Sequence, residues 1–181
     1  GLAVNARGAD HNRSGAYESD LAGRHDRLHG GEPHVAGAIE TEDRAAIMDS
    51  LILCKFLRGA FAEPMDEWAA LLSAVTGWEV DGDELATTAR RIVIAKRLLN
   101  LREGWTRDED WLPERFLTET LQVDSGRTAA LTAGRLRAMI DSYYERRGLE
   151  PLGCPMPDTL RELDLVALVH ESGQTPRGEG D

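Results

Sequence analysis

A single histidine lies between two arginines in the segment RGADHNR, residues 7–13. An imidazole donates and accepts protons near pH 7, and guanidinium groups bind anionic or planar polar groups. The glycine in this segment lets the backbone approach a ligand closely. These residue types suit an anionic or polar ligand, with His11 as its proton donor or acceptor, although a solvated polar loop has the same composition.

A carboxylate and a thiol share an apolar stretch in the segment DSLILCKF, residues 49–56. A buried carboxylate needs a partner, so Asp49 is a candidate binding residue. Cys54 is either a ligand or a small side chain packed in the core. Five residues apart on a straight helix, the two side chains would point about 140° apart. They can serve one ligand only if that ligand is extended or if the helix ends between them.

The elements that must position these residues are predicted to be helices. Residues 1–40 are glycine-rich and hold four of the five histidines, which indicates a loop-rich segment. Apolar residues then recur at helical spacing, and no stretch alternates like a strand, so the predicted class is all-α. The first long helix is expected to be capped by Thr41 and to continue at least to Ile52. Later helices are expected from Pro64 to Gly77, from Asp81 to Gly104 and from Thr132 to Gly148, with short ones after Pro113 and Asp158.

Composition narrows the classes of function. The chain has 181 residues, which suits one domain or two small ones. Its formal net charge of -11 repels phosphate groups, so we expect no nucleic-acid and no membrane partner. No apolar run approaches the ~20 residues of a membrane span, and no signal peptide is visible, which favours a cytoplasmic protein. The two cysteines, Cys54 and Cys154, are too few for a disulfide framework.

The sequence contains no P-loop, no HExxH and no GxSxG. Four stretches instead resemble, in this order, the tungsten-dependent aldehyde ferredoxin oxidoreductases. RGADH (7–11) resembles the family's Arg-Gly-Ala-x-His segment, and DSLILCKF (49–56) resembles its second Asp-x-x-Gly-Leu-Cys motif. RLLNLREGWTRDEDWLPERF (97–116) is similar to its Asn-x-Arg-Glu-Gly and Leu-Pro-x-Arg-Phe run. SYYERRG (142–148) and TLRELDL (159–165) are similar to the end of its last domain.

The resemblance implies an enzyme that oxidises an aldehyde with water to a carboxylic acid and passes two electrons to ferredoxin. It also implies tungsten, or molybdenum, held by two molybdopterins beside a 4Fe-4S cluster. By position, Cys54 matches the fourth cluster cysteine and is the expected metal ligand. Asp49 matches the aspartate that binds one pterin, and His11 matches the active-site histidine expected to move protons beside the metal. Cys154 matches no ligand and is expected to be structural.

The sequence departs from the family pattern at Ile52, which stands where the motif has glycine. We expect an ordinary helical backbone there, because a β-branched residue resists positive φ. On that expectation, replacing Ile52 by glycine destabilises the helix.

The family's other three cluster cysteines, its first pterin motif and its β-rich N-terminal domain are not in this sequence. We therefore expect the C-terminal portion of a longer or split enzyme that needs its missing portion as a partner, and a homodimer is compatible with this interpretation. The alternative is a standalone helical accessory or partner-binding module derived from the family, without catalytic activity.

Four regions are predicted on this basis. Residues 1–40 form a loop-rich active-site segment, and residues 41–122 form a helical, cofactor-proximal region. A bundle-like C-terminal helical region follows at 123–172, and a disordered tail at 173–181.

Overall fold

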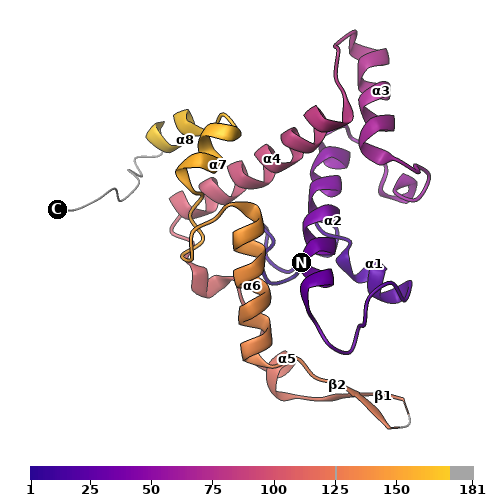
Figure 1. The fold of residues 1–181 in the computed structure, drawn as a ribbon, viewed down its shortest axis with the longest axis vertical. Coiled ribbons are helices and arrows are strands. Elements are labelled where there is room, and N and C mark those ends of the chain that lie inside the picture. The colour runs from indigo at the N-terminus through magenta and orange to yellow at the C-terminus, as the bar shows by residue number, and fades with distance from the viewer. Residues whose placement is uncertain (125, 172–181) are drawn as a thin grey trace, which may run out of the picture.

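A computed structural model describes residues 1–124 and 126–171 and shows a helix-rich chain (Figure 1). The predicted helical character is confirmed, and the tail expected at 173–181 lies outside the described residues. None of the described helices is long and apolar enough to cross a bilayer. The long helices are α2 (Glu32–Ser50), α3 (Pro64–Thr76), α4 (Gly82–Arg102) and α6 (Ala133–Arg147). The short ones are α1 (Ala16–Leu21), α5 (Arg115–Thr118), α7 (Pro157–Glu162) and α8 (Val166–Glu171), with 3-10 turns η1 (Lys55–Leu57) and η2 (Arg107–Glu109).

Most of the predicted helix ends are confirmed, and side-chain caps explain them. The side chains of Asp81 and Thr132 each accept a hydrogen bond from the backbone N–H three residues on, at 2.8 and 3.2 Å. Such bonds satisfy donors that the first turn of a helix leaves without partners. Gly77 and Gly148 follow α3 and α6 with φ of 76° and 68°, a left-handed conformation that ends a helix.

The start of the first long helix differs from the prediction. α2 begins at Glu32 and not at Thr41, and Pro33 lies in its first turn. Proline suits that position because the first N–H groups of a helix have no partner within it. Thr41 lies inside the helix, where its hydroxyl donates to the carbonyl oxygen four residues earlier at 2.7 Å. An irregular glycine-rich segment over residues 1–40 is therefore not confirmed, while the division into four regions stays a prediction.

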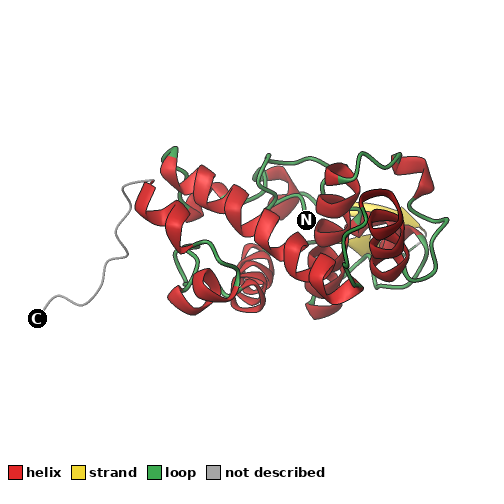
Figure 2. Ribbon diagram, turned by 90° about the horizontal axis from the view of Figure 1, so that it is seen from above, coloured by secondary structure: helices red, strands yellow, loops and turns green. Residues whose placement is uncertain are grey.

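A β-hairpin also departs from the all-α prediction. β1 (Leu121–Asp124) and β2 (Arg127–Ala129) pair antiparallel, with an irregularity in β1 between Gln122 and Asp124. The hairpin projects from the lower end of α6 in Figure 1 and is the yellow element in Figure 2. Strands of four and three residues are too short for an alternating pattern to stand out in the sequence.

The core lies around α4, which packs against α2, α3 and α8. α2 also packs against α6, so these two helices run side by side in Figure 1. A larger apolar cluster joins α4 and α6 to the C-terminal helices, and a smaller one joins the end of α2 to α3 and the start of α4. Members of the larger cluster include Ile94, Leu98, Leu136, Ile140 and Leu163, and those of the smaller include Ile47, Met48, Trp68, Leu85 and Ala89.

Ion pairs and hydrogen bonds of buried charged side chains join α2 to α6. The Arg147 guanidinium, only 2% exposed, donates to Glu42 and to Asp43, each at 2.7 Å. The Tyr143 hydroxyl donates to the same Glu42 carboxylate at 2.6 Å. A buried charge is tolerated only when it is paired and hydrogen-bonded, so this network fixes how the two helices face each other.

A second buried network holds the charged, aromatic stretch that follows α4. The Arg97 guanidinium donates to the Asp110 carboxylate at 2.8 Å, to the Tyr144 hydroxyl at 2.8 Å and to the Gly153 carbonyl at 3.0 Å. It also lies 3.4 Å from the centre of the Trp105 ring. Burial raises the pKa of the Asp110 carboxyl, against the opposing effect of Arg97. These residues therefore tie the loop after α4 to α6 and to the chain between α6 and α7.

Candidate functional site

The end of α2 positions the predicted site residues. The backbone N–H of Leu53 donates to the carbonyl oxygen of Met48 at 2.9 Å, and that of Ile52 donates to the carbonyl oxygen of Asp49 at 3.3 Å. These two bonds form a Schellman motif, in which the residue after the helix takes a left-handed conformation. Ile52 does so, with φ of 57°. The predicted helical backbone at Ile52 is therefore wrong.

The packing on either side explains this turn. Leu51 and Leu53 both lie against the smaller core, which draws the chain inward before and after Ile52. The side chain of Ile52 is left at the apex and is 91% exposed. The helix ends between Asp49 and Cys54, so the angle that a straight helix would set between their side chains does not apply.

The Asp49 carboxylate has cationic partners from both sides. Arg13, in the N-terminal segment, donates to its Oδ2 atom, and the Lys55 ammonium lies 3.0 Å from its Oδ1 atom. Arg13 is also within 3.8 Å of the Asp10 carboxylate, which in turn lies 3.6 Å from Arg7. The structure thus brings the first and second predicted segments together at Asp49.

Positive charge gathers at this place in an otherwise acidic chain. We call Arg7, Arg13, Lys55 and Lys96 the cationic cluster. Burial lowers the pKa of Lys55, and the neighbouring Arg13 and Arg58 charges lower it further. The pKa of Lys96 is lowered by burial and by the charges of Arg13, Arg7 and Lys55. The cationic cluster brings four cations against two paired carboxylates, those of Asp10 and Asp49, so it keeps an excess of positive charge that suits an anionic group.

His11 stands at the rim of a small cavity beside the cationic cluster. The cavity has a volume of about 100 Å³ and is lined by His11 together with Thr41 and Met48 of α2, Lys55 and Trp68. The imidazole is exposed, and its ring centre is 6.2 Å from that of Tyr17. Lys55 also lines this cavity and pairs with the Asp49 carboxylate, so His11 and Asp49 both have this lysine in their surroundings.

Cys54 lies on the surface just beyond the left-handed turn. It forms no disulfide, and its carbonyl oxygen accepts the backbone N–H of Leu57 at 2.9 Å. Its side chain is exposed among apolar neighbours, since Ile52 and Phe56 are 91% and 97% exposed. The alternative that Cys54 is a small side chain packed in the core is not supported, whereas an exposed thiol is accessible to a metal.

Sequence reasoning missed the lysines of the cationic cluster. Lys55 carried a signal, because it interrupts the apolar spacing of the segment after Asp49. Lys96 carried little signal, because a lysine in the middle of a long helix is ordinary on an exposed face. Only the approach of α4 to the N-terminal segment places it beside Arg7 and Arg13, where together they line one small cavity.

Comparison with protein families gives one match over most of the chain. The family model described as aldehyde ferredoxin oxidoreductase, domains 2 and 3, matches residues 1–165. The tungsten-containing aldehyde ferredoxin oxidoreductase of Pyrococcus horikoshii is 30% identical over 172 residues, which cover 91% of this chain and 27% of that protein. The enzyme of the same name from Pyrococcus furiosus is 30% identical over 174 residues, covering 92% and 27%. The chain thus spans about a quarter of the length of these relatives.

A solved structure shares the fold. The active site complex BamBC of benzoyl coenzyme A reductase, determined with 1,5-dienoyl-CoA, superposes with a TM-score of 0.64 over 86% of this chain and 24% of its own. The two sequences are 21% identical, so this likeness concerns the fold alone.

Proposed function

The chain belongs to the aldehyde ferredoxin oxidoreductase family, and on this premise we propose that it supplies the C-terminal part of an enzyme oxidising an aldehyde to a carboxylic acid. The proposed reaction consumes water and releases two protons and two electrons, with ferredoxin as the electron acceptor. Because the matched relatives are about four times longer, residues outside this chain are needed to complete the site.

The cationic cluster fits an anionic pterin cofactor. Molybdopterin carries a phosphate group, and guanidinium and ammonium groups are the usual partners of phosphate. Asp49 lies next to this cluster, and an ionised carboxylate accepts several hydrogen bonds, so it can bind a planar N–H edge while Arg13 and Lys55 hold it in place. We therefore assign Asp49 and the cationic cluster to pterin binding.

The observation that carries the proposal is the exposed Cys54 thiol just beyond the turn that follows Asp49. Thiolates are the usual ligands of iron–sulfur clusters, and four are needed for a 4Fe-4S cluster. Cys54 would supply one, and the remaining three would come from outside this chain. The exposed apolar side chains of Ile52 and Phe56 fit a surface that another part of the protein covers.

In the proposed active site, His11 transfers protons. When bound, the tungsten bis-pterin and the 4Fe-4S cluster supply the two-electron oxidation and carry the electrons towards ferredoxin. The oxidation of an aldehyde by water also releases two protons, and an exposed imidazole at the rim of the cavity can accept one of them at a ring nitrogen. Molybdenum in place of tungsten would leave these roles unchanged.

An activity measurement on the intact protein that contains this chain tests the proposal. We expect aldehyde-dependent reduction of ferredoxin, and we expect His11→Asn to lower kcat by about 10²–10⁴-fold with the metal content unchanged. His29→Asn is the matched control, because His29 is an exposed histidine bonded to Asp26 and takes no part in the proposed site. Equal activity of the two variants would remove His11 from the mechanism.

A noncatalytic accessory module remains the second candidate. The exposed apolar surface at Ile52 and Phe56 favours it as well, because a partner-binding module needs such a surface. Tungsten and pterin in the purified intact protein, together with aldehyde-dependent activity, support the enzyme. Their joint absence from a well-folded protein supports the module.

A further inference from the structure

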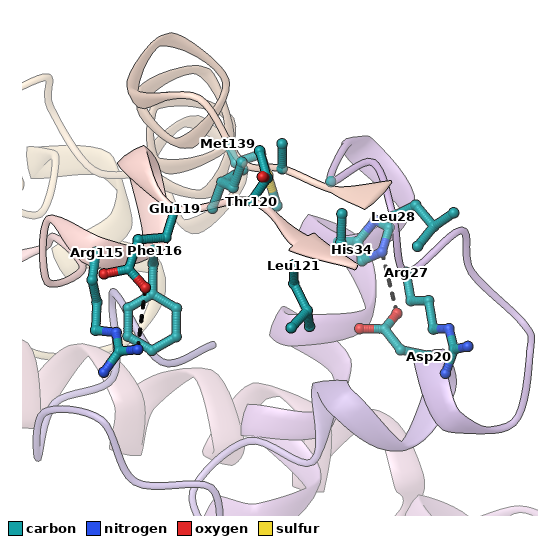
Figure 3. Close-up of a pocket in the computed structure, with 14 residues that line it drawn as sticks. Asp20, Arg27, Leu28, His34, Arg115, Phe116, Glu119, Thr120, Leu121 and Met139 are labelled. Carbon is teal, nitrogen blue, oxygen red and sulfur yellow. Dashed lines mark hydrogen bonds and ion pairs between the residues drawn. The ribbon is translucent and has the colours of Figure 1, made fainter. Parts of the chain in front are cut away.

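Two histidines and an aspartate that belong to no part of the proposed active site converge between α1 and α2. The Oδ1 atom of Asp20 lies 3.2 Å from Nε2 of His34 and 3.8 Å from Nδ1 of His25. The two imidazole rings have centres 5.1 Å apart. One ligand atom from each of the three residues lies within 4.8 Å of the others. In Figure 3 the side chains of Asp20 and His34 point towards each other.

The central carboxylate oxygen lies within ion-pair distance of both imidazoles but accepts no hydrogen bond from the described residues. Oδ1 of Asp20 is buried and has no hydrogen-bond partner among the described residues, although both imidazoles are near it. A buried acceptor without a partner costs about 1–3 kcal/mol, and more when it is charged. By contrast, the exposed carboxylate of Asp26 is satisfied by a hydrogen bond with the His29 ring at 2.7 Å. A cation shared by the three groups would satisfy the Asp20 oxygen.

Defined backbone holds the three side chains. Asp20 lies in α1, and a Schellman motif ends that helix, with the N–H of Arg24 bonded to the carbonyl oxygen of Ser19 at 2.9 Å. His25 follows directly, and His34 lies in the first turn of α2. Gly37 of α2 makes room for the His25 ring, because a Cβ there would lie 2.9 Å from its Cε1 atom. Two of the three ligands therefore lie in helices, and the third, His25, lies in the connecting loop where its ring packs against Gly37.

We propose that Asp20, His25 and His34 bind a zinc ion. Two atoms that are 3.2 Å apart and each about 2.0–2.1 Å from zinc subtend an angle of about 100°, which is close to tetrahedral. The His25 Nδ1 and Asp20 Oδ1 atoms are 3.8 Å apart, whereas tetrahedral zinc ligands are about 3.3 Å apart, so the His25 side chain has to move closer for zinc to bind. Two imidazoles and one carboxylate are a recognised zinc ligand set, and three protein ligands leave the fourth position for water or another small ligand.

The fourth position can be reached from a cavity. Asp20 and His34 line a cavity of about 410 Å³ that extends towards the β-hairpin. Leu28, Phe116, Leu121 and Met139 give it a largely apolar wall (Figure 3). The proposed zinc site thus has an access route of its own and shares no residue with the cationic cluster, Asp49 or Cys54.

The test measures zinc in the intact protein after exposure to micromolar zinc sulfate and removal of the excess by gel filtration. We expect one zinc ion per chain more in the wild type than in the double variant His25→Gln/His34→Gln. Each single variant should weaken binding at least ~10-fold, because loss of a ligand costs no less than loss of a residue that orients one. His29→Gln is the matched control and should bind like the wild type.

A second measurement does not depend on whether the variants fold. The extended X-ray absorption fine structure at the zinc edge of the wild type should show nitrogen and oxygen at about 2.0–2.1 Å with scattering from imidazole. Sulfur in the first shell would place the metal on a cysteine and overturn the assignment. So would equal zinc content in the wild type and in a folded double variant, or a wild type that retains no zinc.

Discussion

At the scale of single residues, Ile52 determines how the candidate site is arranged. Its left-handed backbone ends α2 and turns the chain so that Lys55 returns to the Asp49 carboxylate, 3.0 Å away. The same turn leaves Cys54 on the surface. Glycine adopts this backbone at little cost, whereas an L-residue with a side chain costs about 1–2 kcal/mol there.

Replacing Ile52 by glycine should therefore stabilise the protein, which reverses the expectation from a helical backbone. Because the Ile52 side chain is exposed, its removal loses little buried surface. We expect Ile52→Gly to raise the free energy of unfolding by about 1 kcal/mol, as measured by urea denaturation. Ile52→Ala keeps a Cβ atom and should change the free energy by less than about 0.5 kcal/mol. A loss of stability in the glycine variant would show that the left-handed turn is not the native conformation.

At the scale of elements, α2 carries both proposed sites. His34 lies in its first turn, and Asp49 lies in its last. Its orientation depends on the buried contacts of Arg147 with Glu42 and Asp43, which join it to α6.

Removing Arg147 should cost much more stability than removing its neighbour. Arg147→Met leaves the buried Glu42 carboxylate and the partly buried Asp43 carboxylate without their guanidinium partner, and we expect the free energy of unfolding to fall by about 3–5 kcal/mol. Arg146→Met removes only an ion pair with Glu32, in which the arginine is 48% exposed, and should cost less than about 1 kcal/mol. Equal effects of the two substitutions in urea denaturation would mean that the buried network does not hold the helices together.

Much of the helical architecture could be predicted from local chemistry. Proline, capping side chains and glycine mark the ends of α3, α4 and α6, and each acts within a few residues of its own position. The end of α2 could not be predicted, because it depends on Leu51 and Leu53 both packing against a core formed by distant residues. The hairpin β1–β2 was missed because its strands are too short for a pattern.

In the candidate site, too, the residues that could be predicted are those whose signal is local in the sequence. Arg7, Arg13 and His11 were recognisable because they stand together in the sequence, and Asp49 because a carboxylate in an apolar stretch needs a partner. Lys96 became part of the cationic cluster only through the packing of α4 against the N-terminal segment. The assignment of Cys54 to a cluster came from the resemblance, since composition favoured a packed thiol.

At the scale of the whole molecule, charge and exposure support one arrangement. The chain carries a formal charge of -11, yet four cations gather where α2 ends. Next to them lie an exposed thiol and two exposed apolar side chains, those of Ile52 and Phe56. A surface with these three properties fits an anionic cofactor, a metal cluster and a further part of the protein that encloses both.

The substitution of serine for Cys54 in the intact protein tests this central claim most directly, with electron paramagnetic resonance of the reduced protein and iron content as the measurements. Serine is a poorer ligand for iron than thiolate, so Cys54→Ser should lose or alter the 4Fe-4S signal while the fold survives. Cys154→Ser is the matched control. Cys154 lies in the turn between α6 and α7, where its carbonyl oxygen accepts the N–H of Glu150 at 2.7 Å, and its substitution should leave the signal unchanged. A normal reduced-cluster signal in both variants would contradict the account.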